Sequence, residues 1–346
     1  MVSTNSALRR VIGLVIVGLL WAPVAQPQEP PKPAEKKEEK KEAKKEEKKK
    51  GLTLKPERKI EFTTDEATWL SLDVSPDGRT IVFELLGDLY TLPIDGGAAK
   101  RLTSGLAFDS QPRYSPDGKS IAFLSDREGS ENVWIIKADG TDPKQLSKDT
   151  SSEFASPAWT PDGQYVIVSR SGWALRTYEL WMYHVQGGSG VQITKAKPEP
   201  KTPGPQRHNA MGVSVSRDGR YLYYARKLGG FQYNAQFPMW QIARRDRRTG
   251  EEDILTQALG SAVRPVVSPD GTKLVYATRY ETETGVRLRD LKTGEDRWLK
   301  YPVQRDDQES RFTRDLLPGY AFLPDGKEIV VSYGGKIHRL SIEKTA

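Results

Sequence analysis

Apolar and polar residues alternate in short runs from about residue 51 onward, and these runs recur in groups. One group contains Ser120-Ile-Ala-Phe-Leu-Ser125, then Asn132-Val-Trp-Ile-Ile-Lys137, and closes with the shorter run Lys144-Gln-Leu-Ser147. Runs of this length, rich in Val, Ile, Tyr and Trp, are typical of β-strands. No long helical period interrupts them, so the pattern predicts an all-β domain of short antiparallel strands.

A four-residue phrase, usually Ser-Pro-Asp-Gly, recurs between strand runs. Its aspartates are separated by 40 to 56 residues, and the six copies are Ser75–Gly78, Ser115–Gly118, Thr160–Gly163, Ser216–Gly219, Ser268–Gly271 and Leu323–Gly326. Proline fixes φ at the first corner of such a turn, aspartate caps it, and glycine takes the left-handed position. Each phrase therefore predicts a hairpin turn, and six copies at this period indicate a repeat architecture.

Four-stranded units that repeat around an axis form a β-propeller, and six blades over residues 51–346 give about 49 residues per blade. The last repeat stops after its third strand at Ser341-Ile342, and Arg58-Lys-Ile-Glu-Phe-Thr63 resembles the fourth-strand phrase Lys100-Arg-Leu-Thr103. We therefore predict that residues 58–63 supply the outer strand of the last blade and close the ring. The alternative is a stand-alone strand ahead of an incomplete ring.

These blades resemble those of TolB-type, WD-repeat-like propellers over about residues 51–346. The resemblance rests on the Pro-Asp-Gly turn, the Ile-Ala-Phe-x-Ser strand, the Val-Trp-Ile strand before Ala138-Asp-Gly140, and the ending Gln145-Leu-Ser147. The stretch from Glu61 to Gly118 is similar to the propeller half of exported bacterial proteins that carry an amidohydrolase domain downstream. Similar propellers also precede prolyl-oligopeptidase-type peptidase domains. This chain stops before either catalytic domain would begin, and a Lys/Glu-rich segment replaces the small α/β domain of TolB.

The first 25 residues are predicted to be a secretory signal peptide. Arg9-Arg10 precede the apolar run Val11–Leu20, and small residues follow as far as Ala25. Ten apolar residues span only ~15 Å as a helix, about half the hydrocarbon thickness of a bilayer. We therefore expect export, with a periplasmic location and membrane contact only through the transient signal peptide. An uncleaved membrane anchor is the alternative.

Residues 26–50 are predicted to form a disordered, charged linker. Their Lys and Glu pairs place like charges four residues apart, which disfavours a helix. The formal net charge of the whole chain is +7, but residues 51–346 contribute only +2, from 41 basic and 39 acidic side chains. The predicted propeller is therefore close to neutral, which argues against a nucleic-acid partner.

Residue sets for catalysis or metal binding are absent from the sequence. It contains no cysteine, no His-x-His pair, no Gly-x-Ser-x-Gly elbow and no glycine-rich phosphate loop. His184 and His338 fall in third-strand runs and are interpreted as packing residues, whereas His208 lies in a Pro/Gly-rich loop and is freer to act. We expect no catalytic set, no metal and no cofactor, and the repeated Asp-Gly pairs are interpreted as turns rather than calcium loops.

Loop lengths predict where a ligand would bind. One rim should carry the short Pro-Asp-Gly and Gly-rich turns, while the other should carry the long, variable loops. Variable loops on a rigid scaffold usually hold binding sites, and aromatic and Arg side chains are typical anchors. The candidate binding residues on the long-loop rim are Trp173, Arg176, Tyr178, Arg207, His208, Phe231, Tyr233 and Phe237. The alternative is that some of them only pack the loops onto the blades.

Three functions are compatible with these observations. The favoured one is an exported, non-catalytic propeller that binds a protein, peptide or cell-envelope ligand through its long-loop rim and channel. The alternative is the propeller portion of a truncated or split hydrolase of the amidohydrolase or peptidase type. A propeller enzyme such as a lactonase with a metal in the channel is least favoured, because no ligand set is recognisable.

Overall fold

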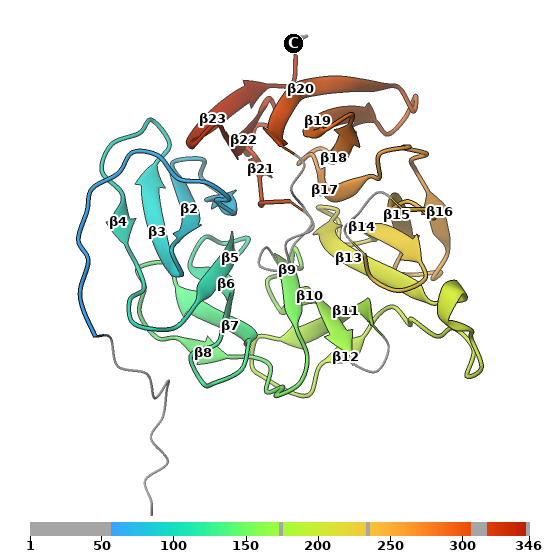
Figure 1. Cartoon of the computed structure of the whole chain (residues 1–346), viewed down its shortest axis with the longest axis horizontal. Helices are drawn as coiled ribbons and strands as arrows, with labels where there is room; N and C mark the ends of the chain where they lie inside the picture. The colour runs from blue at the N-terminus through green and yellow to red at the C-terminus, as the bar shows by residue number, and fades with distance from the viewer. Residues whose placement is uncertain (1–56, 173–175, 233–235, 306–316, 344–346) are drawn as a thin grey trace, which may run out of the picture. The chain divides into compact units, whose positions relative to one another are not determined.

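The Pro-Asp-Gly phrases form the turns between the first and second strands of six β-sheets arranged in a ring (Figure 1). The computed structural model describes residues 57–172, 176–232, 236–305 and 317–343. In the first turn the Ser75 hydroxyl donates to Asp77 Oδ1 at 2.6 Å and accepts the Thr80 N–H at 2.9 Å. Equivalent contacts hold Asp117, Asp162, Asp218 and Asp270. The interpretation of these aspartates as turn residues is therefore confirmed.

Each sheet is one blade, and its strands are antiparallel neighbours in chain order. The first three blades contain β1 (Leu72–Val74), β2 (Thr80–Leu85), β3 (Asp88–Pro93), β4 (Lys100–Arg101); β5 (Asp109–Tyr114), β6 (Ser120–Ser125), β7 (Asn132–Lys137), β8 (Lys144–Gln145); and β9 (Phe154–Trp159), β10 (Tyr165–Gly172), β11 (Thr177–His184), β12 (Val191–Gln192). The last three contain β13 (His208–Val215), β14 (Tyr221–Leu228), β15 (Gln241–Asp246), β16 (Glu252–Ile254); β17 (Val263–Val267), β18 (Lys273–Tyr280), β19 (Glu283–Asp290), β20 (Asp296–Arg305); and β21 (Ala321–Phe322), β22 (Glu328–Tyr333), β23 (Lys336–Ser341). A 3-10 turn, Gly204–Gln206, lies between blades 3 and 4. The predicted six-bladed all-β propeller is confirmed.

The prediction that residues 58–63 form the outer strand of the last blade is wrong. These residues lie in no strand, and the side chains of Ile60 and Phe62 are 66% and 65% exposed. In Figure 1 this blue segment passes the side of blade 1 that carries β4. Blade 6 therefore has three strands among the described residues.

The ring closes by packing and short backbone contacts between blades 1 and 6. Leu72 and Val330 are fully buried in an apolar cluster that the two blades share. The Leu72 N–H donates to the Gly319 carbonyl at 3.0 Å, and the Ala67 N–H donates to the Gly335 carbonyl at 2.9 Å. Because each buried apolar side chain contributes about 1.5–3 kcal/mol, this closure does not require a shared outer strand.

The turn phrases also contact one another around the ring. A Cβ placed on Gly118 would lie 3.4 Å from Pro76 of the preceding blade, and one placed on Gly78 would lie 3.3 Å from Pro324, across the closure. The contact is missing at Gly271, because Arg217 replaces proline in the preceding phrase. A Cβ placed on Gly271 would meet no described atom within 4 Å. The phrases thus pack in series as well as forming hairpins.

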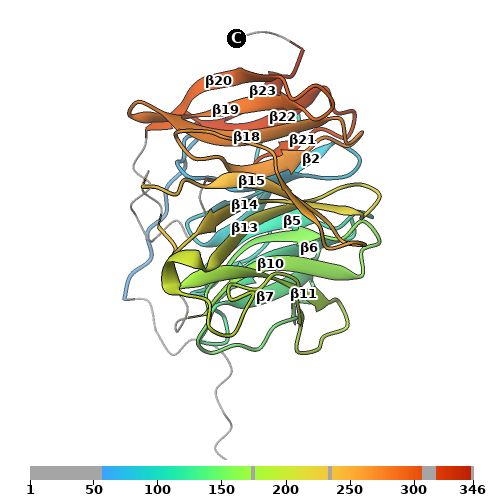
Figure 2. The ribbon, with the colours of Figure 1, turned by 90° about the vertical axis from the view of Figure 1, so that its right-hand side faces the viewer.

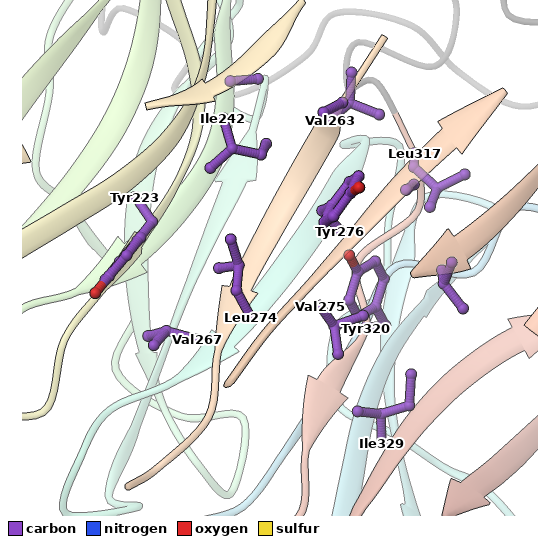
Figure 3. Packing of buried hydrophobic residues seen from close by; sticks show 14 of the residues in the cluster. Tyr223, Ile242, Val263, Val267, Leu274, Val275, Tyr276, Leu317, Tyr320 and Ile329 are labelled. Carbon is purple, nitrogen blue, oxygen red and sulfur yellow. The ribbon is translucent and has the colours of Figure 1, made fainter. Parts of the chain in front are cut away.

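The largest buried cluster joins the blades of the second half. Figure 3 shows Tyr223 and Ile242 of blade 4 facing Val263 and Leu274 of blade 5. From the side, the sheets of blades 5, 4 and 3 are stacked, as β18, β14 and β10 show in Figure 2. The core of the domain is therefore a series of interfaces between sheets.

Hydroxyl side chains, three of them buried and Thr194 half-buried, complete the outer edge of four blades. The fourth strands there have only two or three residues. Beyond each, a hydroxyl accepts a third-strand N–H: Thr103 from Leu89 (2.9 Å), Ser147 from Val133 (2.9 Å), Thr194 from Leu180 (2.8 Å) and Thr256 from Ile242 (2.9 Å). This contact explains why the predicted fourth-strand runs end in an apolar residue and a hydroxyl residue.

Candidate functional site

Six equivalent positions, each six residues before the turn aspartate, meet at the centre of the ring. They are Ser71, Gln111, Ser156, Gly212, Arg264 and Gly319. The Ser156 N–H donates to Gln111 Oε1 at 2.6 Å, and Arg264 Nη1 donates to Ser156 Oγ at 3.0 Å. At four of the positions φ is positive, between 53° and 72°, beside a register shift in the first strand. These bulges direct the residues toward one another, so that a polar layer crosses the channel.

A cavity of about 300 Å³ lies on one side of this layer. Arg264 and Gly212 belong to its floor, and Pro76, Pro116 and Pro161 of the turn phrases belong to its mouth. The cavity therefore opens at the turn rim, which we define as the rim formed by the Pro-Asp-Gly phrases. The channel was predicted to bind a ligand together with the long loops, but the channel cavity faces the opposite rim.

The cavity is lined by more positively charged side chains than negatively charged ones: Arg113 and Arg264 against Asp73. Burial raises the pKa of the Asp73 carboxyl to about 7, although the N–H groups of Tyr114 and Val74 and the charge of Arg264 oppose the shift. Asp73 is partly buried and lines the cavity. Arg113, also in the lining, donates from Nη1 to the Leu72 and Pro112 carbonyls at 2.8 and 2.7 Å. Two guanidinium groups and one weakly acidic carboxyl therefore share the channel.

The shape of the channel floor depends on glycine at position 319. A Cβ placed there would lie 2.1 Å from Arg113 Nη2, 2.5 Å from Ser71 Oγ and 2.6 Å from Arg264 Nη2. Both guanidinium groups thus converge on the space that a side chain would occupy. Within the described residues, the buried Arg113 Nη2 has no hydrogen-bond partner.

Exposed apolar side chains gather on the other rim, which we call the loop rim. It is formed by the loops that join second to third strands and by those that join successive blades. Six large apolar residues there are 46% to 81% exposed: Leu86, Leu106, Phe108, Phe237, Leu259 and Tyr280. The other exposed large apolar residues of the described ranges lie before blade 1 or in fourth strands. A cavity of about 340 Å³ also lies beside Leu259 and Tyr280.

Two of the predicted binding residues pack into the blade interface. Tyr178 is 5% exposed, and its ring centroid lies 5.0 Å from that of Phe231. Phe231 in turn packs against the fully buried Trp240 at 5.8 Å. The Tyr178 hydroxyl donates to Glu153 Oε2 at 3.1 Å. These contacts hold the loops of blades 3 and 4 together.

The remaining predicted residues have different surroundings. Phe237 and Arg176 are exposed, and the Arg176 carbonyl accepts the Phe231 N–H at 2.8 Å. Arg207 is partly buried after the 3-10 turn, and its carbonyl accepts the Gly229 N–H at 2.8 Å. Trp173 and Tyr233 lie outside the described residues.

His208 is more constrained than its loop suggested. It begins β13, and its Nε2 lies 3.2 Å from Arg226 Nη2. Burial, and then the charge of Arg226, lower the pKa of His208, while Glu252 acts in the opposite direction. A neutral imidazole beside a cation is suited to holding Arg226 in place.

Five exposed residues of the loop rim were not among the predicted binding residues: Leu86, Leu106, Phe108, Leu259 and Tyr280. Leu86 carried a signal, because a leucine in the two-residue turn before Asp88 cannot belong to the alternating strand pattern. Among the described residues, no group of three or more His, Cys, Asp or Glu side chains is placed to hold a metal ion. The same ranges contain no helix that is long and apolar enough to cross a membrane.

The ring of six blades and its channel define a six-bladed β-propeller (Figure 1). Its structure is similar to that of putative TolB from Agrobacterium tumefaciens, with a TM-score of 0.59, 20% identity, and coverage of 81% of this chain and 92% of that one. Residues 70–237 match the family of the Tricorn protease N-terminal beta propeller domain. The resemblance to TolB-like propellers is therefore confirmed at the level of fold.

Two curated relatives are similar to this chain over part of their length. The uncharacterized peptidase YuxL of Bacillus subtilis is 28% identical over 198 residues, which is 56% of this chain and 26% of that protein. Tricorn protease homolog 1 of Streptomyces coelicolor is 27% identical over 257 residues, which is 65% of this chain and 24% of that protein. The chain thus spans about a quarter of the length of these relatives.

Proposed function

We propose that this chain is an exported, non-catalytic propeller that binds a protein or peptide ligand through its loop rim. The observation that carries the proposal is the uneven distribution of exposed apolar side chains, six of which lie on the loop rim. A partner that covers these side chains would stabilise the complex by about 25 cal/mol for each Å² of apolar surface buried. Exposed apolar surface that gathers on one face is typical of an interaction site.

The loop rim offers both a surface and a recess to a ligand. Leu86 and Phe108 are neighbours, because a Cβ placed on Gly87 would lie 3.1 Å from the Phe108 ring and the Asp109 N–H donates to the Gly87 carbonyl at 2.8 Å. On blade 5, Tyr280 stands beside the aromatic rings of Trp298 and Tyr301, at 6.3 and 5.8 Å between centroids. Apolar side chains of a protein or peptide complement such positions.

Matched variants on the two rims test this proposal. Wild-type protein, a loop-rim variant (Leu86→Ser, Phe237→Ser, Leu259→Ser) and a turn-rim variant (Lys119→Ala, Lys327→Ala) are immobilised and exposed to envelope extract. All five positions are exposed, so the folds should survive, which circular dichroism checks. A partner that the wild type and turn-rim variant retain and the loop-rim variant loses supports the proposal. A partner lost only from the turn-rim variant contradicts it.

Export is part of the proposal and has its own measurement. It is supported by the basic and apolar pattern of residues 1–25, which lie outside the described residues, and by the TolB-like fold. Cleavage after Ala25 would leave Gln26 at the mature N-terminus. Cell fractionation measures export, and N-terminal sequencing of the recovered protein measures cleavage. An intact Met1 in the cytosolic fraction would contradict export.

A second candidate is the propeller portion of a peptidase-like hydrolase. It is favoured by two relatives that are named as a peptidase and a protease homolog and that are about four times as long as the matched region. Sequencing the DNA that follows the codon for Ala346 tests it. A reading frame for a peptidase domain, in frame or after one frameshift, would support this candidate, and an unrelated gene would contradict it. The association with an amidohydrolase stays a prediction.

A further inference from the structure

The outer edge of β23 differs from that of every other third strand. Each of the other third strands pairs with a fourth strand, whereas in the described residues β23 pairs only with β22. β23 also has no buried residue, while β3, β7, β11, β15 and β19 each have at least two. An unpaired strand edge is a template for another strand.

Comparison with blade 1 shows which backbone N–H and C=O groups of β23 point away from β22. The hairpins match in register, because Leu85 opposes Asp88 across a two-residue turn as Tyr333 opposes Lys336. Ile337 therefore corresponds to Leu89. The Leu89 N–H donates to Thr103 Oγ1 at 2.9 Å, and its carbonyl accepts the Leu102 N–H at 2.7 Å. The N–H and C=O groups of Ile337, and by strand alternation those of Arg339 and Ser341, point outward.

The chain itself indicates what fits such an edge. In four blades the outer segment ends in an apolar residue whose N–H bonds the third strand, followed by a hydroxyl residue that accepts a third-strand N–H. These segments are Lys100-Arg-Leu-Thr103, Lys144-Gln-Leu-Ser147, Val191-Gln-Ile-Thr194 and Asp253-Ile-Leu-Thr256. A fitting occupant is an extended segment with Leu or Ile followed by Thr or Ser.

The segment of this chain with that ending is not at the edge. Arg58-Lys-Ile-Glu-Phe-Thr63 lies in no strand, and its apolar side chains are exposed. The chain after it is anchored at the start of β23, where Lys336 Nζ contacts Asp65 Oδ2 at 2.8 Å. Among the described residues, no segment pairs with the outer edge of β23 beyond Lys336, and Asp65 contacts the start of that strand.

We propose that β23 is a strand-addition site, which takes an extended apolar–hydroxyl segment from a second polypeptide as the fourth strand of blade 6. Main-chain hydrogen bonds to Ile337 and Arg339 supply the pairing, and the Leu–Thr type of ending supplies the selectivity. The site lies on the outer edge of a blade and is independent of the loop rim.

A peptide that copies residues 98–105, labelled with fluorescein, is the direct probe. Its control carries N-methyl leucine at the position of Leu102, which removes the N–H that should bond the Ile337 carbonyl. Fluorescence anisotropy should show saturable binding of the first peptide and binding weaker by about tenfold or more for the second, since a lost hydrogen bond of about 1.4 kcal/mol is tenfold. Equal binding of the two peptides would overturn the proposal.

Hydrogen exchange of the wild-type complex locates the bound peptide without any variant of the protein. Slower exchange at Ile337 and Arg339 is expected. Protection at Leu89 instead would mean that the peptide displaces β4, and would overturn the proposal.

Two variants at position 339 distinguish the contribution of the backbone N–H to peptide binding from that of the side chain. Arg339→Pro removes an outward N–H from an edge strand, where proline is tolerated, and should weaken peptide binding about tenfold. Arg339→Ala keeps that N–H and should bind like the wild type. A variant lacking residues 57–63 tests the intramolecular occupant. If only that variant binds the peptide, the chain fills its own edge in solution and the proposal is wrong.

Discussion

Replacing Gly260 by alanine should destabilise the propeller through a backbone clash. Gly260 lies in the loop between blades 4 and 5, and its carbonyl accepts the Arg279 N–H at 3.2 Å. A Cβ placed on Gly260 would lie 1.8 Å from the Arg279 carbonyl oxygen and 2.7 Å from its carbonyl carbon. Because those atoms belong to β18, no side-chain rotation can relieve the overlap.

The expected cost follows from these contacts. Moving the loop away costs about 1–3 kcal/mol of overpacking, and losing the Arg279–Gly260 hydrogen bond adds about 1 kcal/mol. The restricted unfolded chain of the alanine variant returns about 0.4–1 kcal/mol. The free energy of unfolding should therefore fall by about 1–3.5 kcal/mol. For a domain of about 290 residues, whose unfolding entropy is about 0.6 kcal/mol/K, this lowers Tm by roughly 2–6 °C.

Gly204 provides the matched control. It also lies in a loop between blades, it lacks a left-handed φ, and a Cβ placed on it would meet no described atom within 4 Å. Gly204→Ala should change the free energy of unfolding by less than about 0.5 kcal/mol. Both variants are compared by calorimetry and urea unfolding. Equal stability of the two variants would refute the steric argument.

Three further predictions follow from the fold and the channel. Ser147→Ala removes the acceptor of the Val133 N–H, so the free energy of unfolding should fall by about 1–3 kcal/mol; an unchanged urea midpoint would contradict this. The pKa of Asp73 is about 7 in the fold and 3.8 in the unfolded chain. The free energy of unfolding that this group contributes therefore decreases as pH rises from about 4 to 7. Asp73→Asn should therefore gain stability relative to wild type over that range, and parallel pH profiles would contradict the argument. Deleting residues 57–63 should leave Tm nearly unchanged, because they lie in no strand; a large decrease would show that they pair in solution.

The sequence determined the blades because their signals are local. A Ser-Pro-Asp-Gly turn is held by bonds within about five residues, as Ser75, Asp77 and Thr80 show. The alternation that follows it sets which strand residues face a neighbouring blade. Turn chemistry and strand period thus predicted six hairpin repeats and their ring. The endings Leu-Thr, Leu-Ser and Ile-Thr indicated the outer strands of the first three blades, but the similar ending of residues 58–63 did not form one.

The exposure of the candidate binding residues was harder to predict, because the burial of a loop side chain depends on contacts that are distant in sequence. Tyr178 and Phe231 are aromatic, as binding anchors often are, but although they are 53 residues apart in sequence they pack edge to face, and Phe231 packs on Trp240. An aromatic in a loop is free to bind only if no other loop covers it. Phe237, on the same loop as Phe231, is left exposed. The loop rim was predicted, but which of its aromatics remain available was not.

What the sequence determined by itself was the repeat: the turns, the strand faces and the number of blades, each fixed by contacts between near neighbours. Only the tertiary structure decided how the ring closes, because Leu72, Gly319 and Val330 meet across almost the full length of the domain. It also placed the guanidinium groups of Arg113 and Arg264 around the space beside Gly319; the repeat spacing relates Arg264 to Gly319 but does not show where the side chains point. Resemblance to a fourth strand did not place residues 58–63 on β23, since docking of a strand depends on the whole closed ring and not on its own pattern.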